Sequence, residues 1–156
     1  MPYEISIQSI SASQPTAVVR RRAALRELSR VVPEACGEVW KVIRAEKVQG
    51  AGRNLALYLS LDVDQQLSIE VGVEMAVDFA GAGEVVRSEL PAGRVAVATH
   101  FGPYAGLPGA HRAVRDWCAA NGHEMAGPNW EVYGHWVEEW NVDPSQIRTD
   151  VVYLLK

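Results

Sequence analysis

Apolar residues recur at helical spacing in two stretches of the chain. In residues 25–47 they lie one turn apart, and Pro33 predicts that the regular helix begins near it, because proline fits only the first turn of a helix. Residues 107–121 carry a similar stripe and are followed by a glycine, the residue type that most often ends a helix. The pattern therefore predicts two main helices.

Alternating apolar and polar residues predict strands in the rest of the chain. The predicted strands cover residues 16–22, 55–61, 67–75, 84–90, 93–100, 130–137 and 148–155. Asp62–Gln66 is the predicted turn of a hairpin between the second and third strands, and a longer loop with Pro144 joins the last two.

One segment of the chain occurs twice. Ala51-Gly-Arg-Asn-Leu-Ala-Leu-Tyr58 returns 75 positions later as Ala126-Gly-Pro-Asn-Trp-Glu-Val-Tyr133, with the same Ala-Gly-x-Asn start and the same closing tyrosine. Each copy follows a predicted helix and precedes another strand, so each half has the order strand, helix, strand, strand. We therefore predict a single domain over residues 1–156, with pseudo-repeats at about 15–75 and 84–156.

This order of elements predicts an α+β fold, in which an antiparallel sheet carries the two main helices on one face. In the first copy Leu55, Leu57, Leu59 and Leu61 share one side of their strand, and we expect this side to cover the helices. The opposite side then forms a ligand groove that carries the aromatic and acidic residues Tyr58, Tyr133, Glu70, Asp150 and Glu131.

Composition narrows the functional classes. Nearly half of the residues are apolar (48%) and 22% are charged, which is typical of a folded domain. The net charge is −4, and Arg20-Arg21-Arg22 is the longest basic run, so direct binding of nucleic acid is not expected. Apolar runs stay well below the 18 residues of a membrane span.

The cysteines and histidines predict neither a disulfide nor a metal site. Cys36 and Cys118 lack the CxxC spacing and lie in apolar helical stripes, which is typical of reduced core thiols. The start of the chain lacks the features of a secretory signal, so we expect a cytoplasmic protein. The four histidines are not at metal-ligand spacing and no nucleotide-binding signature is present, so neither a metal nor a cofactor is expected.

Four motifs in the same order resemble those of the GyrI-like family, also called AraC effector-binding or multidrug-sensor ligand domains. They are His100-Phe-Gly-Pro-Tyr104-Ala-Gly-Leu-Pro, a helix with Trp117, the second copy of the repeat, and Thr149-Asp-Val-Val-Tyr-Leu-Leu155. The resemblance covers residues 15–156. It implies a duplicated strand-helix-strand-strand unit with a groove for apolar, often aromatic and cationic, small molecules.

The resemblance also implies two pocket residues. Asp150 matches the acid that the family carries in the last strand, where many members have glutamate, and Tyr133 matches the family's pocket tyrosine. Family members are regulatory halves of transcription factors, stand-alone ligand-binding or gyrase-inhibiting proteins, or hydrolases that open the cyclopropane ring of DNA-alkylating natural products. The chain resembles the stand-alone members.

The residues themselves suggest a wider candidate site. Asp150 and Glu70 are candidate general bases, with an exposed position or an internal ion pair as the alternative. Each remaining candidate has packing or solvation as its alternative. The candidate ligand-binding residues are Tyr133, Tyr58, Glu131, Trp40, Tyr104, His100 and Trp136.

Three functions fit these features. The first is a stand-alone protein that binds apolar aromatic or cationic small molecules in a central groove. The second is a hydrolase that adds water across a strained ring, with one of the acids as base. The third is a gyrase-inhibitor-like protein-interaction module. We expect the first, and the sequence leaves the ligand and the oligomeric state open.

Overall fold

The computed structural model of the protein describes residues 3–61 and 65–156. The chain forms two compact units. The first unit is Ala12–Ala92, and the second joins residues 3–11 to Gly93–Lys156. Each unit combines antiparallel strands with one long helix, so the predicted α+β class is confirmed.

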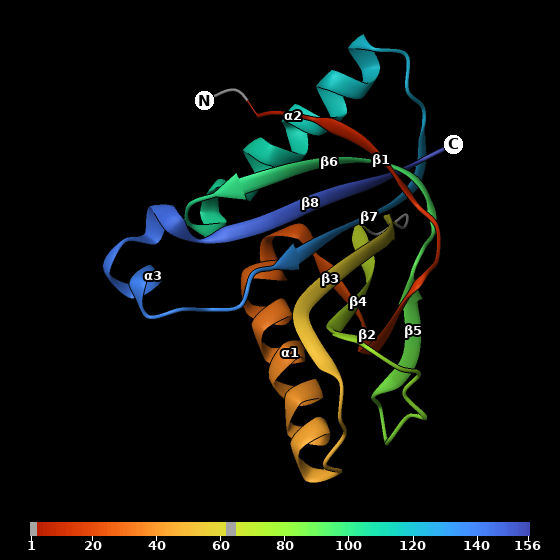
Figure 1. Ribbon diagram of the computed structural model, residues 1–156, viewed down its shortest axis with the longest axis vertical. Helices are drawn as coiled ribbons and strands as arrows, with labels where there is room; N and C mark the ends of the chain where they lie inside the picture. The colour runs from red at the N-terminus through yellow and green to blue at the C-terminus, as the bar shows by residue number, and fades with distance from the viewer. Residues whose placement is uncertain (1–2, 62–64) are drawn as a thin grey trace. The chain divides into compact units, whose positions relative to one another are not determined.

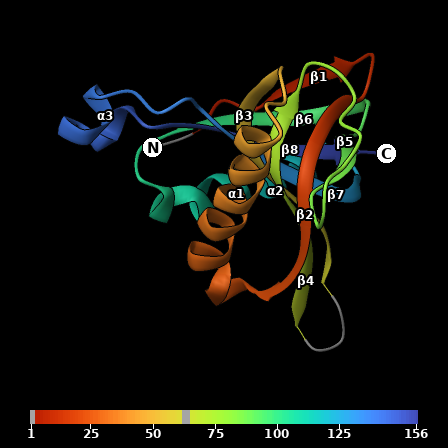
Figure 2. The same cartoon turned by 90° about the horizontal axis from the view of Figure 1, so that it is seen from below.

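The first unit contains strands β2 (Gln14–Ala24), β3 (Ala51–Leu61), β4 (Gln66–Met75) and β5 (Val86–Leu90). They are hydrogen-bonded in the order β3-β4-β2-β5, and each neighbouring pair is antiparallel. A 3₁₀ turn (Leu25–Glu27) leads from β2 into helix α1 (Leu28–Ala45), which lies across one face of this sheet (Figure 2). The helix buries the apolar stripe Ala35, Cys36, Val39 and Ile43.

The second unit contains strands β1 (Ser6–Ile10), β6 (Gly93–Phe101), β7 (Met125–Tyr133) and β8 (Arg148–Leu155). Their order is β1-β6-β8-β7, again antiparallel throughout. Helix α2 (Leu107–Ala120) follows a 3₁₀ turn (Tyr104–Gly106) and packs on β6 and β8 (Figure 1). The short helix α3 (Glu139–Val142) and a 3₁₀ turn (Pro144–Gln146) lie between β7 and β8.

The strand register confirms the internal repeat. Leu57 lies opposite Glu70 in the β3–β4 pair, and Val132 lies opposite Asp150 in the β7–β8 pair. Each unit thus contains a strand, a helix and two further strands in the predicted order. The edge strands differ from this pattern, because β1 joins the second unit through β6 and β5 joins the first through β2.

The start of the first helix differs from the prediction. Pro33 lies in the second turn of α1 instead of its first turn. The helical path begins earlier, in the 3₁₀ turn, where the Glu27 carboxylate accepts the backbone N–H of Ala24 at 2.8 Å. A proline inside a helix costs about 3 kcal/mol, which the burial of the apolar stripe on α1 offsets.

The second hairpin also differs from its prediction. The strand predicted at 130–137 runs from Met125 to Tyr133, because its partner β8 begins only at Arg148, whose carbonyl accepts the backbone N–H of Gly134 at 3.0 Å. The sequence pattern did not predict β1 or α3. Residues 62–64 of the predicted turn Asp62–Gln66 lie outside the described residues.

The two sides of β3 are the reverse of the expected ones. Directly opposed residues of antiparallel strands share a face, so Leu57 lies with Glu70 and Tyr58 lies with Ile69. The Tyr58 face is the one under α1, because the Trp40 indole on α1 donates to the Asn54 side chain on that face at 2.6 Å. The leucine side therefore lies away from the helix.

Burial on both faces explains this error. Leu55 and Ala56 are both fully buried although they point to opposite sides of β3. When both sides of a strand are covered, alternation still shows which residues share a side, but it no longer shows which side meets a helix. Glu70 does lie on the side opposite α1, as predicted, whereas Tyr58 does not.

The two cysteines are free and buried, in agreement with the predicted core thiols. Burial raises the pKa of Cys36 to about 11 and also raises that of Cys118. At pH 8 only about one Cys36 in a thousand is then the reactive thiolate. We expect Ellman's reagent to label neither cysteine in the folded protein and both after unfolding in guanidinium chloride. Rapid labelling of the folded protein would contradict the burial of these thiols.

Candidate functional site

Glu131 lies at the centre of a buried polar cluster in the second unit. Its position on β7 is opposite Val151 of β8, which packs in the α2 core, and only 5% of its surface is exposed. His111 on α2 places its Nε2 2.6 Å from Glu131 Oε2. Tyr133 donates its hydroxyl to Glu131 Oε1 at 2.5 Å. One group from the helix and one from its own strand thus hold this carboxylate.

Two further residues extend this cluster. Tyr153 on β8 places its Oη 2.7 Å from His111 Nδ1, and Arg115 on α2 donates to the same Oη at 3.1 Å. Burial raises the pKa of Tyr153, which therefore remains a neutral phenol at neutral pH. We call the connected residues the polar chain: Arg115, Tyr153, His111, Glu131 and Tyr133.

Tyr104 adds exposed aromatic surface to the polar chain. It begins the 3₁₀ turn before α2, and 43% of its surface is exposed. Its ring meets the ring of Tyr133 edge to face, with 5.6 Å between the centroids. The Tyr133 hydroxyl thus contacts the Glu131 carboxylate and the Tyr104 ring packs on the Tyr133 ring, an arrangement that offers both apolar contact area and a negative charge.

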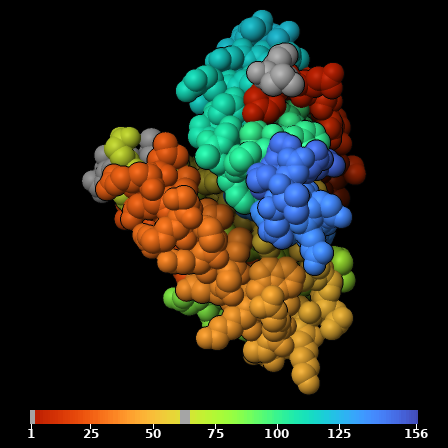
Figure 3. Space-filling model, turned by 90° about the vertical axis from the view of Figure 1, so that its left-hand side faces the viewer, coloured from red at the N-terminus to blue at the C-terminus, as the bar shows by residue number. Residues whose placement is uncertain are grey.

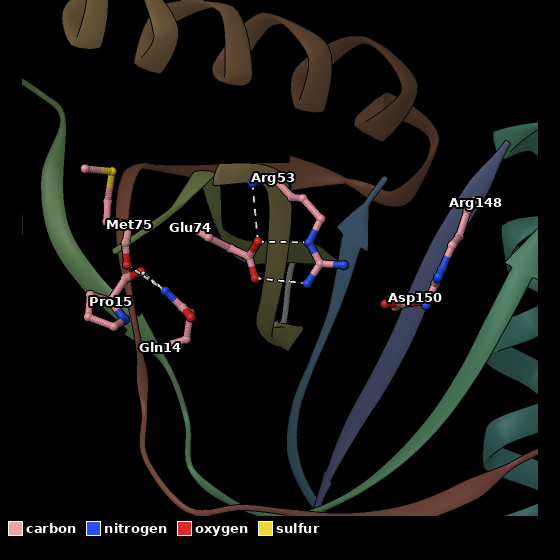
Figure 4. A network of polar contacts seen from close by, with 7 residues as sticks. All are labelled: Gln14, Pro15, Arg53, Glu74, Met75, Arg148 and Asp150. Carbon is pink, nitrogen blue, oxygen red and sulfur yellow. Dashed lines mark hydrogen bonds and ion pairs between the residues drawn. The ribbon is translucent and has the colours of Figure 1, made fainter. Parts of the chain in front are cut away.

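Glu70 lies on the face of the first sheet away from α1 and is held in an ion pair. Its Oε2 accepts from Arg20 Nε at 3.0 Å, and its Oε1 accepts from the Ser88 hydroxyl at 2.5 Å. On the same strand Glu74 pairs with Arg53 at 3.0 Å (Figure 4). Both acids of β4 therefore have cationic partners in their own unit, which agrees with the ion-pair interpretation of Glu70.

Asp150 lies on the face of the second sheet away from α2, opposite Val132. Its Oδ1 accepts from the Thr99 hydroxyl at 3.2 Å and from Arg148 Nε at 3.3 Å. Figure 4 shows the Arg148 and Asp150 side chains on β8. Glu131 and Tyr133 are on the helix face instead. The prediction that these acids and tyrosines share the face opposite the helices is therefore wrong for Glu131 and Tyr133 and right for Asp150.

Tyr58 and Trp40 pack inside the first unit. Tyr58 is buried on the sheet face under α1, where it is the counterpart of Tyr133 in the repeat. Trp40 is half-buried, and besides its hydrogen bond to Asn54 it carries the Arg44 guanidinium 5.6 Å from its ring centroid. These contacts agree with the packing interpretation of both residues.

His100 and Trp136 have local partners in the second unit. The buried His100 ring donates through Nε2 to the Pro103 carbonyl at 3.0 Å, and its Nδ1 forms a hydrogen bond with the Tyr3 hydroxyl at 2.8 Å. Trp136 is 51% exposed, donates to Asn141 at 3.2 Å and meets Trp140 edge to face. The segment around α3, blue in Figure 3, lies at the surface.

A hollow of about 300 Å³ opens in the first unit beside the basic run. It is lined by Arg20, Arg21, Arg22, Leu59, Ser68, Ile69 and Glu70. Arg20 pairs with Glu70, and Arg21 pairs with Glu38 of α1. At least two of the three arginines therefore pair with acids of their own unit.

The described part of the chain contains no group of three or more His, Cys, Asp or Glu side chains placed to bind a metal ion. Within the same residues, none of the helices has both the length and the apolarity needed to cross a membrane.

Sequence reasoning missed three members of the polar chain: His111, Arg115 and Tyr153. A signal was present, because His111 and Arg115 follow Leu107 at intervals of four residues and so share one edge of the buried stripe on α2. Charged residues on that edge must find partners when the helix packs. Which strand residue meets them depends on the three-dimensional structure alone.

Comparisons with known proteins agree with this architecture. The family model for the GyrI-like small molecule binding domain matches residues 4–156. The EcmrR C-terminal domain is similar in structure, with a TM-score of 0.77 and 20% identity over 100% of this chain and 99% of that one. A search of the curated proteins found no match.

Two further solved structures are similar in fold. SAV2435 bound to tetraphenylphosphonium has a TM-score of 0.67 and 12% identity, covering 100% of this chain and 94% of that one. A hydrolase encoded by lin2189 from Listeria innocua has a TM-score of 0.61 and 9% identity, covering 99% and 93%. Because the family model matches nearly the whole chain, the protein belongs to the GyrI-like small molecule binding domain family.

Proposed function

We propose that this protein binds cationic aromatic small molecules, and that Glu131, Tyr133 and Tyr104 form the binding site. The observation that carries this proposal is a buried carboxylate that accepts from the Tyr133 hydroxyl, with the Tyr104 ring packed against the ring of Tyr133. Membership of a family of small-molecule-binding domains supports it, as does the tetraphenylphosphonium bound to the similarly folded SAV2435.

The physical chemistry of the site favours such ligands. A carboxylate in a site of low dielectric constant attracts a cation much more strongly than one in water. The faces of tyrosine rings also attract cations and supply contact area for flat apolar groups. A ligand that combines a delocalised positive charge with aromatic rings can therefore use both parts of the site, and it loses little hydration on entering.

Two variants of Tyr133 separate ring contact from hydrogen bonding. We expect Tyr133→Ala to weaken tetraphenylphosphonium binding by about 1–2 kcal/mol through lost contact area. Tyr133→Phe keeps the ring and removes only the hydroxyl that Glu131 accepts, so its loss should be smaller. Isothermal titration calorimetry measures both, with Tyr3→Phe as a matched hydroxyl deletion elsewhere in the unit. Unchanged affinity in a folded Tyr133→Ala protein would remove Tyr133 from the site.

A second candidate function is hydrolysis of a strained ring. The observation that favours it is that Glu131 lies between two groups able to exchange protons with it, Tyr133 and His111. Glu131 would take a proton from water as the water oxygen bonds to a cyclopropane carbon. The ring C–C bond breaks, and its electron pair passes into the conjugated ligand, which solvent then protonates. A hydrolase with the same fold supports this candidate.

Product analysis distinguishes the two candidates. We expect the binding protein to leave a cyclopropane-containing indole unchanged during incubation, and mass spectrometry would then show only the starting compound. A product heavier by one water that forms with the wild-type protein, and not with Glu131→Gln, would establish hydrolysis. Glu70→Gln and Asp150→Asn serve as controls, because their acids lie away from the helix face of each sheet.

A further inference from the structure

The polar chain has a fixed direction of hydrogen bonding. A guanidinium can only donate, so the Arg115–Tyr153 contact makes Tyr153 Oη an acceptor. At the other end a carboxylate can only accept, so His111 Nε2 donates to Glu131. Tyr153 remains protonated, and its own hydrogen then goes to His111 Nδ1. In this arrangement a neutral His111 imidazole carries its hydrogen on Nε2.

The first repeat serves as an internal control for the polar chain. His111 and Arg115 occupy the fifth and ninth positions of α2, and the same positions of α1 hold Val32 and Cys36. The strand positions of Glu131 and Tyr153 correspond in the repeat to Ala56 and Val73. All four counterparts in the first unit are apolar.

This comparison separates the fold from the function of the polar chain. The first unit builds the same strand, helix and hairpin around apolar residues, so the fold does not need polar groups at these positions. Burying a charged residue is costly unless all of its partners are in place. The second unit carries this cost at Glu131, the buried carboxylate of the proposed site.

We propose that His111 is a positioning residue for ligand binding, and that Tyr153 and Arg115 fix its tautomer. By donating from Nε2, His111 holds the Glu131 carboxylate ionised and in one orientation, while Tyr133 holds its other oxygen. Cationic ligands then meet a preformed negative group and do not have to order it when they bind. This inference rests on the proposed binding site at Glu131.

The tautomer can be measured without a ligand. In protein labelled with ¹⁵N-histidine, NMR distinguishes imidazoles protonated at Nε2 from those protonated at Nδ1 and from imidazolium. We expect His111 to carry its hydrogen on Nε2 at neutral pH in the free protein. A hydrogen on Nδ1 would overturn the inference, whether or not the protein binds the probe.

Two variants then test the effect on binding, with tetraphenylphosphonium as the probe. His111→Val copies the first repeat and should fold, but its affinity should fall by about tenfold because the carboxylate is no longer held. His111→Gln keeps an N–H near the place of Nε2 and should restore most of the affinity. His123→Gln is the matched control, because His123 stacks on Trp117 outside the polar chain.

The outcomes separate this inference from the proposed function. Equal affinity in wild type and a folded His111→Val protein would overturn the positioning role, and so would a failure of His111→Gln to recover affinity. If wild type itself did not bind tetraphenylphosphonium, the proposed function would fail on that result, and the NMR tautomer would still confirm or reject the arrangement of the polar chain.

Discussion

Gly72→Ala is expected to prevent the first unit from folding. A methyl group at this position of β4 would lie 1.9 Å from the Ala17 carbonyl oxygen and 2.8 Å from the Val18 Cα, which are backbone atoms of β2. Backbone within a paired strand cannot move aside without breaking the sheet. We expect the free energy of unfolding to fall by at least about 4 kcal/mol, a large part of the usual stability of a domain.

Gly37→Ala is the matched control, because it adds the same methyl group to the same unit. Gly37 lies within α1, and a Cβ there would have no atom within 4 Å. Alanine favours helix formation over glycine, so this variant should gain about 0.5–1 kcal/mol. Guanidinium denaturation followed by circular dichroism measures both variants. Equal denaturation midpoints for Gly72→Ala and wild type would contradict the close backbone approach of β2 and β4 in the structure.

The second large effect is expected from Glu131→Gln. This change removes the negative charge and keeps nearly the same shape, so it tests charge directly. We expect tetraphenylphosphonium to bind more weakly by about 2–4 kcal/mol, the usual cost of losing one member of a buried charge pair. Triphenylphosphine oxide, which has aromatic rings and no net charge, should lose much less affinity. Calorimetric titration with both probes gives the comparison.

Equal losses for the charged and the neutral probe would contradict a direct role of the Glu131 charge. Glu124→Gln is the control for this variant, because Glu124 pairs with Lys156 at 3.7 Å at an exposed position. An exposed pair of this kind contributes little to stability or to the field at a buried site.

Much of the fold could be predicted from the sequence because the repeat doubles each signal. The two helices, both hairpins and the strand Arg148–Leu155 follow from periodicity and from the shared Ala-Gly-x-Asn segment. The edge strand β1 could not be predicted in this way, because it lies far in sequence from β6, with which it pairs. Its exposed positions also lack a regular alternation.

The site was harder to predict than the fold, and the reason is the burial of both sides of the central strands. Ala56 and Tyr58 are buried, and so are Leu55 and Leu57 on the other side of the strand, so hydrophobicity could not show which side α1 covers. The same ambiguity placed Glu131 and Tyr133 on the wrong face of β7. The strand register and the contacts of α2 resolve it, and they bring His111 to a carboxylate 20 residues away.

The most direct test of the account is a crystal structure with tetraphenylarsonium, whose arsenic atom is located by anomalous scattering. Binding at the proposed site predicts an arsenic peak beside the Glu131 carboxylate, with phenyl groups against the rings of Tyr104 and Tyr133. A peak beside Asp150, or in the hollow next to Arg20, with none at Glu131, would contradict the proposed site.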